Sequence, residues 1–279
     1  LIEYICREAP DIVHLHNLHS NFIHLPNLLR FLGEYDIPTV LTLDDCWYYT
    51  GKCCHYAPAG CLRWRNGCGK CPLLREDNPS WFFDASARMW LDKKQLFSSI
   101  PRLGVIGVSE WVTGEARESL LSSAKVMRRI YNWVDTEVFT PSKGSAPPSH
   151  PAVSDAGFVV LAVASRWGHA KGLEDLLMLP QIAGGLGAES PSEGVCLVLV
   201  GEIPPSVQLP PNVIAVGPID ATEQLARLYA SADVFVHLSK VETFGKVTAE
   251  ALSCGTPAIV YRSTANPEVV GEGCGYVVD

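Results

Sequence analysis

Two glutamates, Glu242 and Glu250, lie eight positions apart on either side of Gly245 and Lys246. Gly245 and Lys246 are expected at the N-terminus of a helix, where free backbone N–H groups and the helix dipole favour an anion. A glycine at such a position lets a phosphate approach the backbone closely. A carboxylate cannot attract a phosphate, so its expected partners are hydroxyl groups of a ribose or a sugar. These residues therefore predict a site for a phosphorylated ligand that also carries hydroxyl groups.

The elements around these residues form a strand–helix–strand unit. Residues 232–239 are almost continuously apolar and predict a buried strand, and residues 256–261 predict a second one. Residues 247–254 have helical spacing, and Gly255 followed by Pro257 is the expected helix stop. The predicted phosphate position therefore follows the carboxyl end of a parallel strand.

A pair of cations, Arg166 and Lys171, follows another predicted strand at residues 158–164. The helix predicted at 173–182 begins directly after them. Two cations at the end of a strand and beside a helix start can clamp a diphosphate, because both can donate hydrogen bonds to its oxygens. The alternative is that both are solvated cations on a surface loop.

The first half of the chain also alternates strands and helices, with strands predicted at 12–16 and 39–43 and a helix at 21–34. Strands that are apolar on both faces indicate a parallel sheet covered by helices. Ligand groups of such sheets cluster past the carboxyl ends of strands. The polar residues at these ends are candidate site residues, with the alternative that they only satisfy local backbone: His16, Asn17, Asp44 and Asp45.

A cysteine-rich insertion occupies residues 50–75, where four cysteines are separated by seven, six and two residues: Cys53, Cys61, Cys68 and Cys71. We expect this loop to lack a hydrophobic core of its own and therefore to need a cross-link that stabilises it. Four thiolates suit a tetrahedral structural zinc ion, and the last pair forms a knuckle that places two of them on one metal. The alternatives are two disulfides, which a reducing compartment disfavours, and unliganded thiols.

Composition limits the remaining classes. The 279 residues carry a net charge of −8, which disfavours nucleic acid as a partner. No segment approaches the ~18 consecutive apolar residues of a membrane-spanning helix. Residues 144–157 are rich in Ser, Pro, Gly and Ala and predict a linker between a domain at 1–143 and a domain at 158–279. The chain begins with Leu1, and we interpret it as a fragment of a longer protein.

The strings at residues 242–257 and 166–172 together resemble the motifs of family 4 retaining glycosyltransferases of GT-B fold. The strand ending in His16-Asn17 and the Asn132-x-Val-Asp135 turn also look like elements of this family. Residues 45–53 with the insertion behind them resemble a bacterial subgroup related to colanic-acid-type exopolysaccharide glycosyltransferases. The resemblance covers essentially the whole chain.

The resemblance implies an α/β fold of two Rossmann-like domains whose parallel sheets face each other across a cleft. The first domain would be incomplete at its N-terminus and the second truncated at its C-terminus. Arg166 and Lys171 would neutralise the donor diphosphate, with Glu242 holding the donor sugar and Glu250 the ribose hydroxyls. The remaining donor contacts would come from Phe244, Gly245 and Lys246 at the helix start and from Gly217 and Ile219 near the nucleotide base.

The function implied is transfer of a sugar, with retention at the anomeric carbon, from a UDP- or GDP-sugar to a saccharide acceptor. In the subgroup this acceptor is expected to be a lipid-linked oligosaccharide in bacterial polysaccharide biosynthesis. The expected location is the cytoplasm, with peripheral contact at the inner face of the cytoplasmic membrane, and no metal is expected in catalysis. One departure stands out: Asp44 occupies the position where the subgroup has a histidine that contacts the donor sugar.

Three other classes are consistent with parts of the pattern. A nucleotide-sugar epimerase or a phosphorylase could use the same scaffold, although the cysteine insertion disfavours both. A non-catalytic nucleotide-sugar-binding homologue is favoured by Asp44. A dehydrogenase is disfavoured, because no Gly-x-Gly-x-x-Gly sequence follows a strand.

Overall fold

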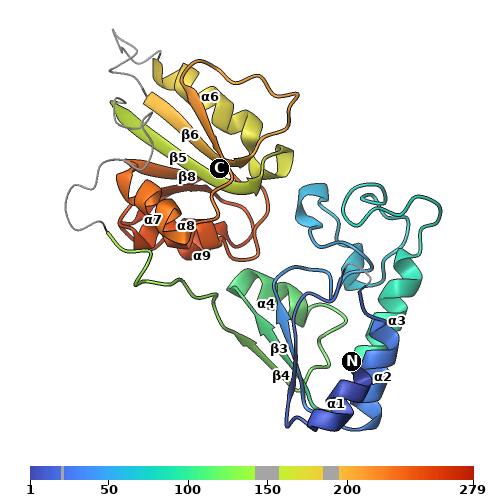
Figure 1. Cartoon of the computed structure of the whole chain (residues 1–279). Helices are drawn as coiled ribbons and strands as arrows, with labels where there is room; N and C mark the ends of the chain where they lie inside the picture. Colours follow the sequence, from blue (N-terminus) through green and yellow to red (C-terminus); the bar gives the residue numbers. More distant parts are fainter. Residues whose placement is uncertain (20–21, 142–156, 185–194) are drawn as a thin grey trace. The chain divides into compact units, whose positions relative to one another are not determined.

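Each half of the chain folds around its own parallel sheet (Figure 1). The computed structural model describes residues 1–19, 22–141, 157–184 and 195–279. It divides the chain into two units, Leu1–Tyr131 and Asn132–Asp279. This division comes earlier than the predicted end of the first domain at residue 143. Apart from Gly157, the predicted linker at 144–157 lies outside the described residues.

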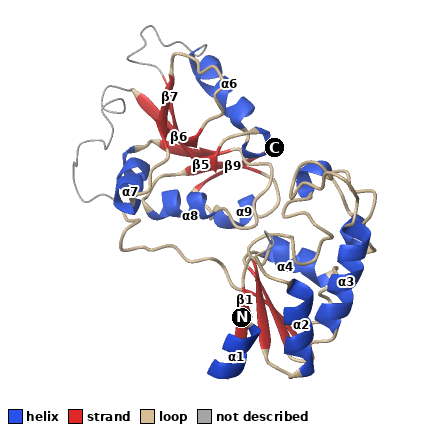
Figure 2. Ribbon diagram, turned by 45° about the vertical axis from the view of Figure 1, so that its right-hand side comes forward, coloured by secondary structure: helices blue, strands red, loops and turns tan. Residues whose placement is uncertain are grey.

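The first unit has a four-stranded sheet in the order β1-β2-β3-β4, with every pair parallel. Its strands are β1 (Val13–Leu15), β2 (Thr39–Leu43), β3 (Leu103–Gly107) and β4 (Val126–Arg129). Its helices are α1 (Ile2–Glu8), α2 (Leu25–Glu34), α3 (Ser86–Ser98) and α4 (Glu110–Arg117). Figure 2 shows α2 and α3 side by side.

Leucine spacing explains how α2 packs. Leu25, Leu28, Leu29 and Leu32 lie on one face of the helix and are all buried. The helix begins four residues later than the sequence predicts, because the His24 side chain caps it by accepting a hydrogen bond from the Asn27 N–H.

The cysteine-rich insertion has an aromatic core, so the expectation that it lacks one is wrong. Its regular elements are two short 3₁₀ turns, η1 (Ala57–Ala59) and η2 (Arg63–Arg65). Tyr49, Tyr56 and Trp64 are buried and pack with ring centroids 5.1–6.2 Å apart. The indole N–H of Trp90 in α3 donates to the Trp64 carbonyl, which anchors the insertion to the unit.

The second unit has a six-stranded, fully parallel sheet in the order β10-β9-β8-β5-β6-β7. Its strands are β5 (Phe158–Arg166), β6 (Val195–Glu202), β7 (Val213–Gly217), β8 (Val234–His237), β9 (Ala258–Tyr261) and β10 (Gly275–Val278). Its helical elements are η3 (His169–Lys171), α6 (Leu173–Gly184), α7 (Thr222–Ser231), α8 (Lys246–Ser253) and α9 (Asn266–Val269).

Helices cover both faces of this second sheet. Alternate residues of β5 point to opposite sides, as a strand requires. Val159, Leu161 and Val163 join a core that includes α7 and α8 residues, whereas Val160 and Ala162 join a core with α6 residues. No helix in the described ranges has the length and hydropathy that a lipid bilayer crossing requires.

The residues just before 142 also belong to the second unit. Phe139 is buried in its core and lies edge-on to Tyr229. The Phe139 carbonyl accepts a hydrogen bond from Ser253 at the end of α8. This packing is the reason why the two units divide at residue 131 and not near residue 143.

The order of the second sheet creates a topological switch point between β5 and β8. From β5 the chain adds β6 and β7 on one side, and then β8, β9 and β10 on the other. The loops after β5 and β8 therefore leave in different directions and open a crevice at the carboxyl edge, where ligands of doubly wound sheets bind. The residues after these two strands are the ones that the sequence singles out.

Candidate active site

The loops after β5 and β8 hold Lys171 and Glu242 in direct contact. The Lys171 ammonium donates to the Glu242 carboxylate at 2.5 Å. The loops are tied together by the Lys240 N–H, which donates to the Ala170 carbonyl at 2.9 Å. Gly172 has a positive φ of 69°, and a side chain there would collide with the Leu238 carbonyl. The Lys-Gly pair of the sequence therefore places the lysine against the end of β8.

His237, the last residue of β8, completes this contact. Its imidazole is 4% exposed and lies 3.1 Å from the same Glu242 oxygen that Lys171 contacts. The Glu242 backbone N–H donates to Thr264, which holds the loop in place. Burial alone would raise the pKa of Glu242, but the hydrogen bond with His237 and the charge of Lys171 outweigh it and lower the pKa to about 2. Glu242 is therefore ionised at neutral pH.

Helix α8 begins as the sequence predicts and presents its N-terminus beside Gly245. Gly245 caps the helix with a φ of 93°, a left-handed conformation that favours glycine. Within the described residues, the buried side-chain oxygens Thr248 Oγ1 and Asn266 Oδ1 have no hydrogen-bond partner. Both lie 3.8 Å from the position that a Cβ at residue 245 would take. Next to the predicted phosphate position, the Thr248 hydroxyl can therefore donate a hydrogen bond to a ligand, and the Asn266 amide oxygen can accept one.

Glu250 lies in α8 two turns after the glycine cap. Its buried carboxylate accepts a hydrogen bond from the Tyr229 hydroxyl at 3.3 Å. Burial raises the pKa of Glu250, and the charge of Lys246 together with the Tyr229 hydrogen bond offsets this rise only in part. Lys246 is exposed, and its ammonium lies 5.7 Å from the Trp133 ring centroid. Glu250 is thus held by one tyrosine, with its second oxygen left for another donor.

The other predicted donor residues are spread around the same sheet edge. Arg166 ends β5 with a side chain that is 75% exposed and pairs with Glu202 at the end of β6, 3.0 Å away. Gly217 ends β7 with a φ of 78°, and Ile219 is packed against the core. Phe244 is buried beside the glycine cap. The structure gives Arg166 a partner different from that of Lys171.

Two His–Asp pairs occupy the carboxyl edge of the first sheet. His16, just after β1, lies 3.2 Å from Asp44, just after β2. His19 and Asp45 pair in the same way at 3.1 Å. Asp45 also accepts a hydrogen bond from the Trp47 N–H at 2.8 Å. Of the four predicted residues at this edge, Asn17 is exposed and is not drawn into either pair.

Four of the five cysteines of the insertion line a single pocket with Tyr56 and Trp64, and these four are the predicted ligands Cys53, Cys61, Cys68 and Cys71. Burial raises the pKa of the Cys53 and Cys68 thiols. None of the ten cysteines, all of which lie in described segments, forms a disulfide. The insertion therefore places the four predicted ligands around one cavity, but no three of their sulfur atoms lie within 4.8 Å of one another.

Sequence reasoning missed three residues of these sites, namely His237, Tyr229 and His19. His237 carried a usable signal, because a titratable ring inside an apolar strand is costly to bury without a partner. Tyr229 had none, since an aromatic residue in an amphipathic helix normally belongs to the core. His19 lies three residues after His16, within a loop whose path the sequence does not fix.

The fold and the site define an α/β protein with a candidate phosphate site at the switch point of its second sheet. Residues 204–279 match the family described as "Glycosyl transferases group 1". Over its whole length the chain is 29% identical to an Escherichia coli K12 protein named as a colanic acid biosynthesis glycosyl transferase, WcaC, of which it covers 66%. Over 52% of its length it is 31% identical to a GDP-mannose-dependent alpha-mannosyltransferase of Corynebacterium glutamicum, of which it covers 34%.

Solved structures agree on the fold. The chain is similar to the Anabaena protein Alr3699/HepE in complex with UDP, with a TM-score of 0.65 at 18% identity over 99% of this chain and 67% of that one. It is also similar to the sucrose-phosphate synthase of Thermosynechococcus elongatus, with a TM-score of 0.64 at 18% identity over 99% of this chain and 62% of that one. The predicted GT-B fold is confirmed. The chain spans 66% of the length of WcaC and 62% of the synthase.

Proposed function

We propose that this chain belongs to an enzyme that transfers a sugar from a nucleoside-diphosphate sugar to a saccharide acceptor, with retention at the anomeric carbon. The observation that carries the proposal is the contact of Lys171, Glu242 and His237 at the switch point, next to the N-terminus of α8. A cation, a helix N-terminus and an ionised carboxylate at one crevice offer partners for phosphate and for hydroxyl groups together.

In this proposal the second unit binds the donor. The Lys171 ammonium and the backbone N–H groups at the start of α8 receive the diphosphate. Arg166, whose side chain is exposed and extended from β5, swings from Glu202 onto the same phosphates. Glu250 accepts hydrogen bonds from the ribose hydroxyls through the oxygen that Tyr229 does not use.

Bond breaking places the electron pair of the anomeric C–O bond on the departing diphosphate. Cations and helix N–H groups that already surround this oxygen stabilise the charge as it develops. The acceptor hydroxyl attacks from the same face, and its proton passes to an oxygen of the leaving phosphate. Glu242 cannot supply a proton at neutral pH, because its pKa lies near 2. Its role is to accept hydrogen bonds from hydroxyls of the donor sugar.

The donor base is either uracil or guanine. One relative is named as GDP-mannose-dependent, and one similar structure holds UDP. The acceptor we propose is a lipid-linked oligosaccharide of bacterial polysaccharide biosynthesis, which the likeness to the colanic acid protein favours.

Calorimetric titration of the full-length protein with UDP-, GDP- and ADP-sugars tests the donor site. We expect one base to bind, and we expect Glu250→Ala and Arg166→Ala each to weaken binding by about 1–3 kcal/mol, as for hydrogen bonds to charged groups. Matched controls are Glu223→Ala and Arg227→Ala, which remove exposed residues of α7. Absence of binding to the folded wild type would contradict the proposal.

Product analysis separates the alternatives. A transferase consumes donor only together with an acceptor or water, whereas a nucleotide-sugar product formed without acceptor indicates an epimerase. Donor binding without transfer or hydrolysis indicates a non-catalytic homologue, and restoring histidine by Asp44→His then tests whether Asp44 is the cause.

We further propose that the pocket lined by Cys53, Cys61, Cys68 and Cys71 holds a structural zinc ion. Support comes from the four thiols lining one cavity and from the absence of a disulfide among the ten described cysteines. An ion would draw the thiols closer, because no three of their sulfur atoms lie within 4.8 Å of one another. Four thiolates complete a tetrahedral zinc shell without an open position, which suits a structural role. Cys61→Ser should lower both the zinc content and the melting temperature, whereas Cys6→Ser, at an exposed thiol, should change neither.

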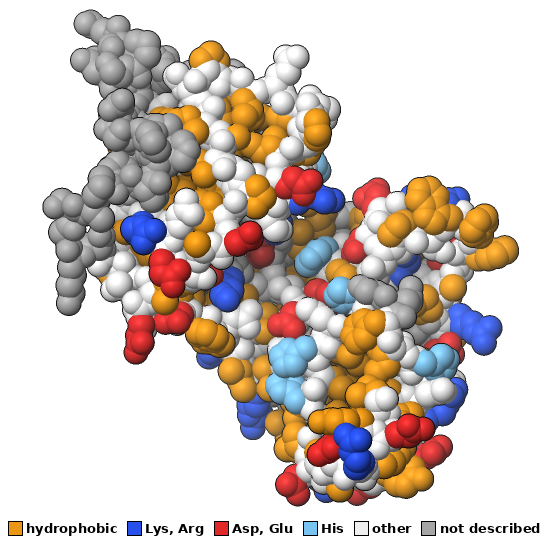
Figure 3. Space-filling view, viewed as in Figure 1, with side chains coloured by type: hydrophobic (Ala, Val, Ile, Leu, Met, Phe, Trp, Pro, Cys, Tyr) orange, Lys and Arg blue, Asp and Glu red, His pale blue; other side chains and the backbone are white. Residues whose placement is uncertain are grey.

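Peripheral membrane contact is proposed through the loop that precedes α3. Trp81, Phe82 and Phe83 are 66%, 88% and 81% exposed, and Figure 3 shows hydrophobic side chains exposed in this region (upper right). Aromatic side chains favour the membrane–water interface. Cosedimentation with anionic vesicles should fall for Phe82→Ser/Phe83→Ser and stay unchanged for Tyr276→Ser, an exposed aromatic residue of β10. If both variants bind the vesicles equally well, the loop before α3 is not the site of membrane contact.

A further inference from the structure

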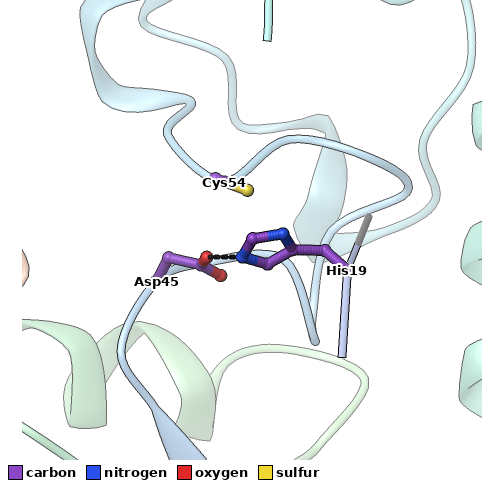
Figure 4. A group of neighbouring side chains, drawn as sticks. All are labelled: His19, Asp45 and Cys54. Carbon is purple, nitrogen blue, oxygen red and sulfur yellow. Dashed lines mark ion pairs between the residues drawn. The ribbon is translucent and has the colours of Figure 1, made fainter. Parts of the chain in front are cut away.

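Three potential metal ligands from separate segments meet at the carboxyl edge of the first sheet. His19 comes from the loop after β1, Asp45 from the loop after β2, and Cys54 from the start of the insertion. Figure 4 shows the three side chains pointing toward one another. Their ligand atoms all lie within 4.8 Å of one another. Among the described residues, no other group of three His, Cys, Asp or Glu side chains is this close together.

We propose that His19, Asp45 and Cys54 form a zinc site, distinct from the four-cysteine pocket. Zinc–ligand bonds of about 2.0–2.3 Å in tetrahedral geometry place ligand atoms roughly 3.3–3.8 Å apart. The His19 Nε2 and Asp45 Oδ2 atoms are 3.1 Å apart, so a small outward movement admits the ion between them. The site lies outside the donor-binding residues, and its existence does not depend on the proposed sugar transfer.

The surroundings orient these ligands as the partners of metal ligands do. The Trp47 N–H donates to Asp45 Oδ1, which leaves Oδ2 directed at His19. The Asn78 amide donates to the Cys54 sulfur at 3.1 Å. Hydrogen bonds of this kind fix the direction of a ligand and strengthen metal binding. Asp45 itself is buried, which removes competing water from its carboxylate.

The donor set selects the ion. Imidazole nitrogen, carboxylate oxygen and thiolate sulfur together suit zinc, whereas magnesium and calcium take oxygen ligands alone. One thiolate and one carboxylate neutralise a divalent ion.

Such an ion would connect the loops after β1 and β2 to the insertion. Three protein ligands leave a fourth position for water or another oxygen ligand, in contrast to a closed structural site. The ion would thereby fix the edge of the sheet where Asp44 and His16 also lie. We assign the ion the role of positioning the loops after β1 and β2 at this edge.

The test counts metal ions in the purified full-length protein by mass spectrometry. His19→Ala and Cys54→Ser should each contain one zinc ion fewer per chain than the wild type. The controls His55→Ala and Cys274→Ser, which remove an exposed histidine and an exposed cysteine, should keep the wild-type content. Because only the difference is counted, the result does not depend on whether the four-cysteine pocket holds zinc.

Unchanged zinc content in folded His19→Ala and Cys54→Ser would overturn the proposal. X-ray absorption at the zinc edge of the wild type needs no variant and covers the case in which these variants fail to fold. We expect nitrogen or oxygen neighbours in addition to sulfur. A shell of sulfur alone, or a protein without zinc, would overturn the proposal equally.

Discussion

The two sheets carry different chemistry at the same edge. At the carboxyl edge of the first sheet, histidines pair with aspartates, as in His16–Asp44 and His19–Asp45. At the carboxyl edge of the second, a lysine and an arginine pair with glutamates, as in Lys171–Glu242 and Arg166–Glu202. The architecture decides where polar groups gather, and the residue types decide which ligand they suit.

Topology adds a second difference. The described strands of the first sheet follow chain order, whereas the second sheet reverses direction between β5 and β8. The reversal gives the second edge a crevice and a helix N-terminus beside it. Diphosphate binding is therefore expected at the second edge, and metal binding at the first.

Removal of the central cation should have the largest effect. In the full-length protein, Lys171→Ala should lower kcat for sugar transfer by about 10²–10³-fold, as does loss of one group that stabilises a leaving-group charge. Lys125→Ala, at an exposed lysine before β4, should leave kcat within about twofold. Equal rates of sugar transfer for wild type and Lys171→Ala would show that the phosphates do not bind at the second edge.

The ion pair at the second edge should also give a pH signature. Glu242 has a pKa near 2 in the folded protein and an ordinary value of 4.5, so its ionised form stabilises the fold above pH 4.5. This contribution, about 3 kcal/mol, is lost as the pH falls from 4.5 toward 2. The stability difference between wild type and Glu242→Gln in urea unfolding should therefore shrink over this range.

Glu223→Gln is the matched control for this titration, because Glu223 is exposed on α7. Its difference from wild type should be small at every pH. A difference for Glu242→Gln that stays constant between pH 7 and pH 3 would show that the carboxylate is not held by Lys171 and His237.

Glycine substitutions compare the backbone of the two units. Gly245→Ala should destabilise the second unit by about 1–2 kcal/mol, because an alanine is strained at a φ of 93° although space for its Cβ exists. Gly114→Ala in α4, where a Cβ meets no atom within 4 Å, should be neutral or stabilising by up to about 1 kcal/mol. Hydrogen exchange of the backbone amides of α8 and α4 measures both changes in stability. A stabilising effect of Gly245→Ala would contradict the left-handed conformation of the helix cap.

The smallest effect concerns the exposed pair of the first edge. A double-mutant cycle on His16 and Asp44 should give a coupling below about 1 kcal/mol, since both side chains are solvated. The same cycle on Lys171 and Glu242 should give a larger coupling, because Glu242 is only 17% exposed. A reversed order would contradict the contrast between the two edges.

The elements were largely predictable from the sequence. The apolar runs and the Gly255–Pro257 stop predicted β8, α8 and β9 within two residues. Helix α4 ends at Arg117, where Ser119 bonds to the Ala116 carbonyl and to the Leu121 N–H, a local contact that the spacing of apolar residues does not reveal. The boundary between the units was placed too late, since nothing in the sequence shows that Phe139 packs beside Tyr229.

The candidate site was predictable where it follows strand ends. Lys171, Glu242 and Gly245 lie together at the switch point because loop positions after neighbouring strands are set by topology. His237, the other partner of Glu242, was missed because pairing between a strand residue and a loop residue five positions later depends on the turn between them. The convergence of Cys54 on His19 and Asp45 depends on the path of an irregular loop, which periodicity does not reveal.

A crystal structure of the full-length protein with bound UDP or GDP would show whether the second sheet holds the donor. We expect phosphate oxygens within hydrogen-bond distance of the Lys171 ammonium and of the backbone N–H groups that begin α8, with Glu250 at the ribose. A nucleotide bound at the first sheet, or one whose phosphates contact neither Lys171 nor α8, would show that the donor site lies elsewhere.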